Sequence, residues 1–404
     1  MVDKIKTIIN EILIVLYSLI MGDKKTSEDN LQEKIILIPY ANIFGDVVLL
    51  LDCIEEFEHL YPASEGYKVV FVCRPAIKKF LLTIYPQCTL NNEVVDWTRF
   101  ARDFKYYLDV LHVYDACYEK VIVPYDHTVT NDLFVRSVRA KEKITQDYDI
   151  SHNEKALSYI LGKNVYSKMI TVDKNISVLK RQRVLINELG NKTFKSRIPY
   201  IKPLKAKQMA LPKVYAVICP TASYPPKCWP IDRFAKVADY LSEKYNCSVC
   251  VCGGNENPGI FEKISALTND NTVLIDMLDK TDFAQWAELM RGARIALCND
   301  SASYHLAAAV RTPAVCVAGD FACVNAPLYD PDIISANDKV PIVLYNKMPC
   351  EGCRYIGYRY GYGNDKCTEM IKNQGILKCV YDIDLSEVLG AIDMQIEKYH
   401  IDFS

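Results

Sequence analysis

The chain has 404 residues, of which half are hydrophobic and 24% are charged; this globular composition excludes a disordered or fibrous protein. Lys and Arg total 48 against 50 Asp and Glu, so the net charge of -2 gives no overall attraction to nucleic acid, and no nucleic-acid partner is expected. The length corresponds to two or three domains. The 16 cysteines, in a long chain without a clear cleavable signal, favour the reducing cytoplasm.

Residues 1–33 are predicted to form an apolar helix followed by a polar linker. Residues 4–21 are mostly apolar, but their uninterrupted part is shorter than the ~20 residues of a membrane span. Two interpretations stay open. In the first, the helix makes a peripheral contact with the inner face of the cell membrane, and its flanking lysines lie near anionic headgroups. Alternatively, it packs against the protein itself or in the interface of a homo-oligomer.

From residue 34 onward, short apolar runs alternate with amphipathic stretches. In the first half we predict strands at 35–39, 67–73, 120–124 and 168–172. We predict helices at 46–60, 75–85 and 175–189, and Gly190 is a stop signal for the last of them. Residues 191–212 are rich in Lys and Pro and lack periodicity, which indicates a connection between two domains.

A second alternating series begins at residue 214. We predict strands at 214–219, 248–252, 272–275, 294–298 and 314–318, and helices at 231–244, 259–267, 282–291 and 303–310. Strands that alternate with helices form right-handed crossovers and a parallel sheet. The chain is therefore predicted to be α/β, with two Rossmann-like domains. In such sheets ligands bind in the loops beyond the carboxyl ends of the strands.

The first of these loops, residues 39–46, ends at Gly45 and Asp46. A carboxylate at the start of the next helix can accept a proton from a substrate hydroxyl. The alternative, which the sequence alone favours, is that it caps the helix, because Asp is a preferred N-cap residue. Both interpretations stay open.

The second loop, residues 219–230, contains Thr221, Ser223 and Lys227. Two hydroxyls and an ammonium group before a helix N-terminus suit a phosphate or diphosphate. The alternative is a surface turn with a solvated lysine.

The third loop follows the strand at 248–252 and contains Gly253, Gly254 and Glu256. Paired glycines let a ligand press against the backbone, and Glu256 is placed to bind a ribose or base. A simple turn is the alternative, because glycine pairs often mark turns.

The fourth loop runs from Asp300 into a helix through Ser301, Ala302 and His305. Ser301 and His305 are four residues apart, so they share one helical face near the positive end of the helix dipole. Small residues here allow close approach of a diphosphate.

Together these loops resemble glycosyltransferase family 9, the ADP-heptose heptosyltransferases, over roughly residues 34–390. The matching segments are Gly45-Asp46, Lys227-Cys228-Trp229-Pro230, Gly253-Gly254 and Asp300-Ser301-Ala302-Ser303-Tyr304-His305-Leu306. The resemblance implies a GT-B fold, in which two Rossmann-like domains face a central cleft. It places the acceptor in residues 34–198 and the nucleotide sugar in residues 199–404.

The resemblance also implies the reaction, an inverting transfer of a heptose from ADP-heptose to a glycan, such as lipopolysaccharide, or to a protein. Asp46 takes the position of the base, and Lys227 with the helix start near Ser301 stabilises the leaving diphosphate, so no catalytic metal is expected. The implied donor-binding residues are Thr221, Ser223, Lys227, Gly254, Glu256, Asp300, Ser301, Ala302 and His305. Ala302 departs from the glycine usual in the family. A non-catalytic nucleotide-sugar-binding or scaffold protein and a GT-B-like nucleotide-sugar epimerase are the alternatives.

The cysteines divide into two groups. Those in or beside predicted strands are interpreted as core residues: Cys73, Cys219, Cys250, Cys252, Cys298 and Cys316. Residues 349–380 contain Cys350, Cys353, Cys367 and Cys379, which could hold tetrahedral zinc or iron. Two disulfides or free thiols are the alternatives. This segment is similar to the iron-binding finger of family members that glycosylate autotransporter adhesins, which implies a structural iron or zinc.

Overall fold

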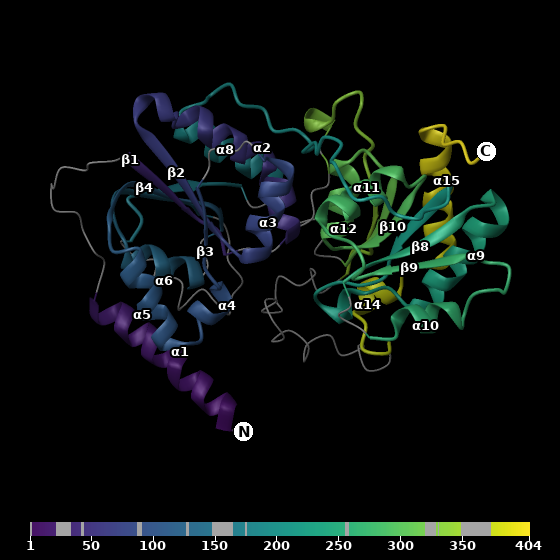
Figure 1. The fold of residues 1–404 in the computed structure, drawn as a ribbon, viewed down its shortest axis with the longest axis horizontal. Coiled ribbons are helices and arrows are strands. Elements are labelled where there is room, and N and C mark those ends of the chain that lie inside the picture. The colour runs from purple at the N-terminus through teal and green to yellow at the C-terminus, as the bar shows by residue number, and fades with distance from the viewer. Residues whose placement is uncertain are drawn as a thin grey trace. The chain divides into compact units, whose positions relative to one another are not determined.

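The computed structural model describes residues 2–21, 34–41, 44–86, 91–126, 129–147, 165–173, 176–254, 258–319, 329, 331–348 and 373–404. By their internal contacts, the residues divide into two compact units. Unit 1 is Met1–Ile43, Asp52–Ile176 and Lys180–Ser196, and unit 2 is Phe44–Leu51, Ser177–Leu179 and Arg197–Ser404. Each unit contains one six-stranded sheet with helices around it (Figure 1).

The sheet of unit 1 has the order β3-β2-β1-β4-β5-β6, and all neighbouring strands are parallel. Its strands are β1 (Lys34–Pro39), β2 (Tyr67–Cys73), β3 (Asn91–Val94), β4 (Cys117–Asp126), β5 (Arg139–Asp147) and β6 (Lys168–Thr171). The predicted strands at β1, β2, β4 and β6 are confirmed. The prediction missed β3 and β5, because their sequences, NNEV and RAKEKITQD, carry too few apolar residues to signal strands.

The first half of the chain contains more helices than the sequence predicted. They are α1 (Val2–Met21), α2 (Phe44–Leu60), the 3-10 turn η1 (Ala63–Glu65), α3 (Pro75–Ile84), α4 (Trp97–Phe100), α5 (Phe104–Val113), α6 (Val129–Ser137) and α8 (Val178–Leu189). The helix α8 begins three residues later than predicted, at Val178, and Gly190 follows its end with a φ of 140°. A left-handed φ of this kind favours glycine, which agrees with its predicted role as a stop signal.

The predicted N-terminal helix is confirmed as α1, which packs on unit 1 by one face. Ile14 is fully buried there. The ring of Tyr17 packs edge-on against Phe104 and Tyr107 of α5, with centroid distances of 5.8 and 6.1 Å. Packing against the protein, one of the two interpretations of this segment, therefore holds for this face. In the described ranges, no helix has the length and apolarity needed to span a membrane.

Unit 2 repeats the arrangement of unit 1 with the sheet order β12-β11-β10-β7-β8-β9, again parallel throughout. Its strands are β7 (Tyr215–Cys219), β8 (Ser248–Gly253), β9 (Leu274–Leu278), β10 (Ala296–Asn299), β11 (Ala314–Val317) and β12 (Ile342–Leu344). Its helices and 3-10 turns are η2 (Pro225–Lys227), α9 (Ile231–Tyr245), α10 (Ile260–Ser265), α11 (Phe283–Gly292), α12 (Ala302–Ala309), η3 (Pro331–Ile333), α14 (Lys378–Tyr381) and α15 (Leu385–Lys398).

Both sheets have the same topology. Counted from the first strand of each unit, the order is 3-2-1-4-5-6, the order of the dinucleotide-binding Rossmann sheet. The predicted α/β class with two Rossmann-like parallel sheets is confirmed. In this topology the chain reverses direction across the sheet between strands 1 and 4, and ligands bind at that point beyond the carboxyl ends. In unit 2 these two strands are β7 and β10.

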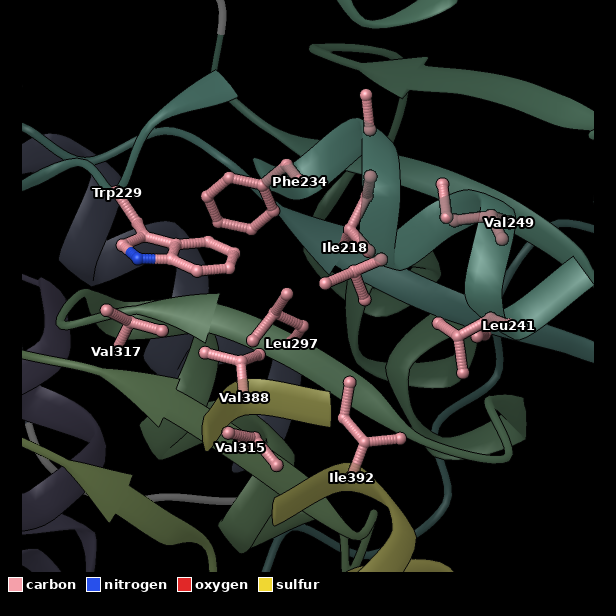
Figure 2. Close-up of a cluster of buried hydrophobic side chains, with 14 of the residues drawn as sticks. Ile218, Trp229, Phe234, Leu241, Val249, Leu297, Val315, Val317, Val388 and Ile392 are labelled. Atoms are coloured by element: carbon pink, nitrogen blue, oxygen red, sulfur yellow. The ribbon is translucent and has the colours of Figure 1, made fainter. Parts of the chain in front are cut away.

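The core of unit 2 packs between its sheet and the helices α9 and α15. Figure 2 shows the rings of Trp229 and Phe234 side by side, with Val388 and Ile392 of α15 in the same cluster. The two rings meet edge-on with centroids 5.5 Å apart. The six cysteines predicted to be core residues are all buried free thiols: Cys73, Cys219, Cys250, Cys252, Cys298 and Cys316.

Candidate functional site

The candidate site is the carboxyl edge of the unit 2 sheet, where β7 and β10 are neighbours. Asn299 ends β10 and is fully buried. Its Oδ1 accepts a hydrogen bond from the backbone N–H of Trp229 at 2.9 Å, and its Nδ2 donates to the carbonyl of Cys219 at 3.4 Å. These bonds fix the loop after β7 against the end of β10. Asn299 was not among the predicted site residues; its only sequence signal was its place directly before Asp300.

Lys227 and Asp300, from two different predicted loops, meet at this edge. The Lys227 Nζ lies 2.7 Å from Asp300 Oδ2, and the two side chains are only 16% and 11% exposed. The same Nζ lies 3.5 Å from the Asp300 carbonyl oxygen. An ammonium group has three N–H donors, and Lys227 directs its charge to both the carboxylate and the carbonyl of Asp300 at the start of α12. The pairing also offsets the carboxylate charge that would otherwise repel an anion.

The helix α12 begins directly after this pair. Ser301 is its N-cap residue, and the Ser301 hydroxyl accepts a hydrogen bond from the backbone N–H of Ser303 at 3.4 Å. Ala302 is the first helical residue, with a short side chain at the helix start. The remaining N–H groups and the helix dipole make such an N-terminus suitable for an anionic group.

His305 lies in the second turn of α12 and is buried. Burial lowers the pKa of His305 from 6.5 to about 4; the nearby Asp300 opposes this shift and Lys227 adds to it. The imidazole is therefore neutral at pH 7. Its Nδ1 has no hydrogen-bond partner in the described part of the chain. Since buried polar atoms are nearly always satisfied, this nitrogen is available to a ligand.

The loops after β7 and β8 touch through Thr221 and Gly253. A Cβ atom at Gly253 would lie 2.3 Å from the Thr221 Oγ1, and Gly253 has a φ of 139°. Both facts require glycine here. Thr221 is buried, Gly254 is half-buried and Ser223 is exposed to solvent. Glu256 lies outside the described residues.

Asp46 is the third residue of α2, in its first turn. An N-cap residue precedes the first helical residue, so the structure does not bear out the alternative that Asp46 caps this helix. By its contacts the start of α2 belongs to unit 2. A Cβ atom at Gly45 would lie 3.2 Å from His305 Cδ2, so glycine permits this close approach.

The metal-ligand prediction is only partly within the described residues. Cys379 lies in α14 and is buried in the apolar core of unit 2. Cys350, Cys353 and Cys367 lie outside the described ranges. Within those ranges no group of three or more His, Cys, Asp or Glu side chains is arranged to hold a metal ion. The metal site stays a prediction.

Comparison with known sequences identifies relatives of this chain. The family model for glycosyltransferase family 9 (heptosyltransferase) matches residues 116–352, more than half of the chain. Lipopolysaccharide heptosyltransferase 3 of Escherichia coli K12 is 33% identical over 105 residues, which are 26% of this chain and 30% of that protein. Lipooligosaccharide heptosyltransferase 2 of Haemophilus ducreyi is 33% identical over 103 residues, 25% of this chain and 29% of that protein. The alignments thus span less than a third of either relative.

Solved structures match over much more of the chain. A family 9 glycosyltransferase from Veillonella parvula has a TM-score of 0.62 at 15% identity, covering 92% of this chain and 100% of that one. Escherichia coli heptosyltransferase WaaC with ADP has a TM-score of 0.57 at 15% identity, and the match covers 90% of this chain and 98% of that one. The iron-containing dodecameric glycosyltransferase TibC of enterotoxigenic Escherichia coli has a TM-score of 0.52 at 14% identity, and the match covers 92% of this chain and 79% of that one. These matches confirm the predicted GT-B fold.

Proposed function

The chain belongs to glycosyltransferase family 9, and we propose that it is an inverting glycosyltransferase that moves a heptose from ADP-heptose to a glycan or protein acceptor. The observation that carries the proposal is the pairing of Lys227 with Asp300 at the start of α12. The proposal assigns the donor to residues 199–404 and the acceptor to residues 34–198. The heptosyltransferase relatives, two of which act in lipopolysaccharide or lipooligosaccharide synthesis by name, support the donor sugar and a glycan acceptor.

The donor diphosphate would lie at the N-terminus of α12. Lys227 and the free N–H groups of that helix stabilise the charge that develops on the leaving diphosphate, because they are fixed in place before the reaction. The neutral His305 donates or accepts one hydrogen bond through its unpartnered Nδ1. Thr221, Ser223 and Gly254 line the adjoining loops, and Glu256 is assigned to the ribose or base.

The acceptor hydroxyl would be activated by Asp46. A carboxylate in the first turn of α2 accepts the proton as the acceptor oxygen attacks the anomeric carbon. The bond to the diphosphate breaks on the opposite side, so the configuration at that carbon inverts. The close approach of Gly45 to His305 supports this placement of Asp46 beside the donor loop.

The substitution Asp46→Asn tests the base directly. It keeps the shape of the side chain but removes the proton acceptor, so turnover should fall by ~10²–10⁴-fold. The affinity for ADP, measured by calorimetry, should stay within about twofold, because Asp46 is assigned to the acceptor step. The matched control is Glu55→Gln, an exposed carboxylate on the same helix, which should leave turnover unchanged.

The assay is release of ADP from ADP-heptose, with products followed by mass spectrometry. Near-normal turnover in Asp46→Asn would remove the base assignment. Conversion of the donor without any acceptor would instead identify an epimerase or hydrolase.

Lys227→Met tests the donor assignment separately. It removes the ammonium but keeps the aliphatic stem, and it leaves Asp300 without its cation. The affinity for ADP should fall by ~10-fold or more, as expected for a lost charged hydrogen bond. An unchanged affinity would take Lys227 out of the donor site.

We also propose a structural iron or zinc on Cys350, Cys353, Cys367 and Cys379. The four thiols supply the number and type of ligands that these metals take. The iron in TibC supports the proposal by similarity of fold. The measurement is elemental analysis of purified protein; less than a few tenths of an equivalent of iron plus zinc would contradict it.

A further inference from the structure

The helix α1 exposes a large aliphatic surface. Nine aliphatic side chains between Ile5 and Met21 are 36% to 81% exposed. In the rest of the described chain, large hydrophobic side chains of this exposure occur singly, as at Leu82 and Val113. Single exposed side chains are ordinary on a protein surface, whereas a contiguous apolar patch marks an interaction site.

The exposed side chains form one wide stripe. Ile5, Ile9, Ile12, Leu16 and Leu19 recur at spacings of four and three residues, which places them along one helical face. At about 100° per residue, eight of the nine fall within an arc of about 140°, and the arc contains no polar residue.

The opposite face holds α1 on unit 1. Ile14 and Ser18 are buried, and Arg136 of α6 donates from Nε to the Ser18 carbonyl at 3.1 Å. Arg102 reaches Glu11 at 3.6 Å. These contacts fix the rotation of α1 about its axis, so the aliphatic stripe points away from the body of the unit.

The width and area of the stripe indicate which kind of partner covers it. A paired helix covers a narrow seam of two positions in seven, which would leave the flanking Ile8, Leu13 and Ile20 in water. A stable protein interface buries ~20–30 residues a side, far more than this stripe provides. A bilayer surface covers the whole arc at once. Lys6 is exposed at the edge of the stripe, where an anionic headgroup would lie.

We propose that α1 attaches unit 1 to the surface of a lipid bilayer, with its aliphatic stripe among the acyl chains just below the headgroups. An amphipathic helix of this kind lies in the plane of the interface and does not cross it. The attachment does not depend on the proposed transfer reaction, because α1 contributes no residue to the candidate site.

Flotation of the purified full chain with vesicles tests this attachment. One vesicle is phosphatidylcholine alone, and the other contains about a third phosphatidylglycerol, which separates apolar insertion from charge attraction. The wild type should float with both, and more with the second. The triple variant Ile9→Gln/Ile12→Gln/Leu16→Gln should lower the bound fraction by ~10-fold or more, since glutamine keeps the helix but does not insert.

The matched control is Leu82→Gln/Val113→Gln/Leu267→Gln, which removes three aliphatic side chains elsewhere that are 48%, 71% and 52% exposed. It should float like the wild type, and circular dichroism checks that each variant is folded. The attachment is refuted if the wild type stays with neither vesicle, or if the α1 variant floats unchanged. It is also refuted if light scattering shows a wild-type oligomer that the α1 variant dissociates, which would assign the stripe to a second copy.

Discussion

The two units have the same strand order but different interiors. Unit 1 packs an aromatic cluster built on Trp97, Phe100 and Phe134, with centroids 5.3 to 6.0 Å apart. The core of unit 2 is mainly aliphatic, with Trp229 and Phe234 at one side. The topology therefore does not depend on which apolar side chains fill the core, because any residues of suitable volume and pattern can cover a parallel sheet.

The units also differ in what their buried polar side chains join. In unit 1, Tyr166 donates to Asp132 at 2.8 Å, and burial raises the pKa of Tyr166 well above its usual value. These groups bond to each other within the unit. In unit 2, the side chain of Asn299 joins the loop after β7 to the end of β10. Among the described residues both units hold buried polar atoms without a hydrogen-bond partner, such as Trp97 Nε1 in unit 1 and His305 Nδ1 in unit 2. The two units therefore share a strand order, whereas the proposed donor site depends on the polar loops of unit 2 alone.

The largest expected effect is the loss of unfolding free energy when either of the two buried tryptophans is replaced. Trp97→Ala and Trp229→Ala should each cost ~3–5 kcal/mol of unfolding free energy, because each leaves a large cavity. Only Trp229→Ala should also weaken ADP binding, since the cavity would loosen the loop whose backbone N–H at residue 229 bonds to Asn299. Urea unfolding and calorimetry measure both quantities. Equal loss of ADP affinity in the two variants would mean that the units are not functionally distinct.

The next comparison is between two buried amides. Asn299→Ala and Gln146→Ala each remove a buried side-chain hydrogen-bond donor, which should cost ~1–3 kcal/mol. Asn299→Ala should in addition lower the affinity for ADP, whereas Gln146→Ala, in unit 1, should not. The prediction fails if ADP binds both variants as tightly as the wild type.

The pH dependence of the unfolding free energy should distinguish the buried His305 of unit 2 from an exposed histidine of unit 1. Its folded pKa of about 4 lies below the unfolded value of 6.5, so the unfolded chain binds more protons between these values. The contribution of His305 to the free energy of unfolding is present above pH 6.5 and is lost as the pH falls toward 4. Between about pH 7 and pH 5 this loss amounts to roughly 2 kcal/mol. His305→Gln should remove this part of the slope, and the exposed His112→Gln of unit 1 should not. Urea unfolding of each variant at pH 7 and at pH 5 measures this difference.

The smallest effects are expected at the surface ion pairs. Lys244 lies 2.7 Å from Asp393 in unit 2, and Lys168 lies 2.9 Å from Glu188 in unit 1, all four being about half exposed. Lys244→Met and Lys168→Met should each change the unfolding free energy by less than about 1 kcal/mol. A larger loss at Lys244 alone would show that the tyrosines around Asp393 make this pair cooperative.

The regular elements were the most predictable part of the fold. Apolar runs such as β2 and β8 are buried on both faces, so they stand out in the sequence as strands. The polar β5 and the short α4 could not be predicted this way, because their state depends on neighbours that are distant in the chain. The loop motifs pointed to Lys227, Asp300 and His305, since glycine, charge and helix-start signals are local.

The amino-acid sequence alone determined the α/β class, the resemblance to the family and the residue types of the proposed donor loops, because hydrophobic period and motif spacing are properties of the chain. Only the tertiary structure decided that Lys227 pairs with Asp300, that Asn299 joins their loops and that His305 is neutral. It also decided which side of α1 is covered. Pairing, burial and pKa depend on distances between residues far apart in sequence, and folding alone sets those distances.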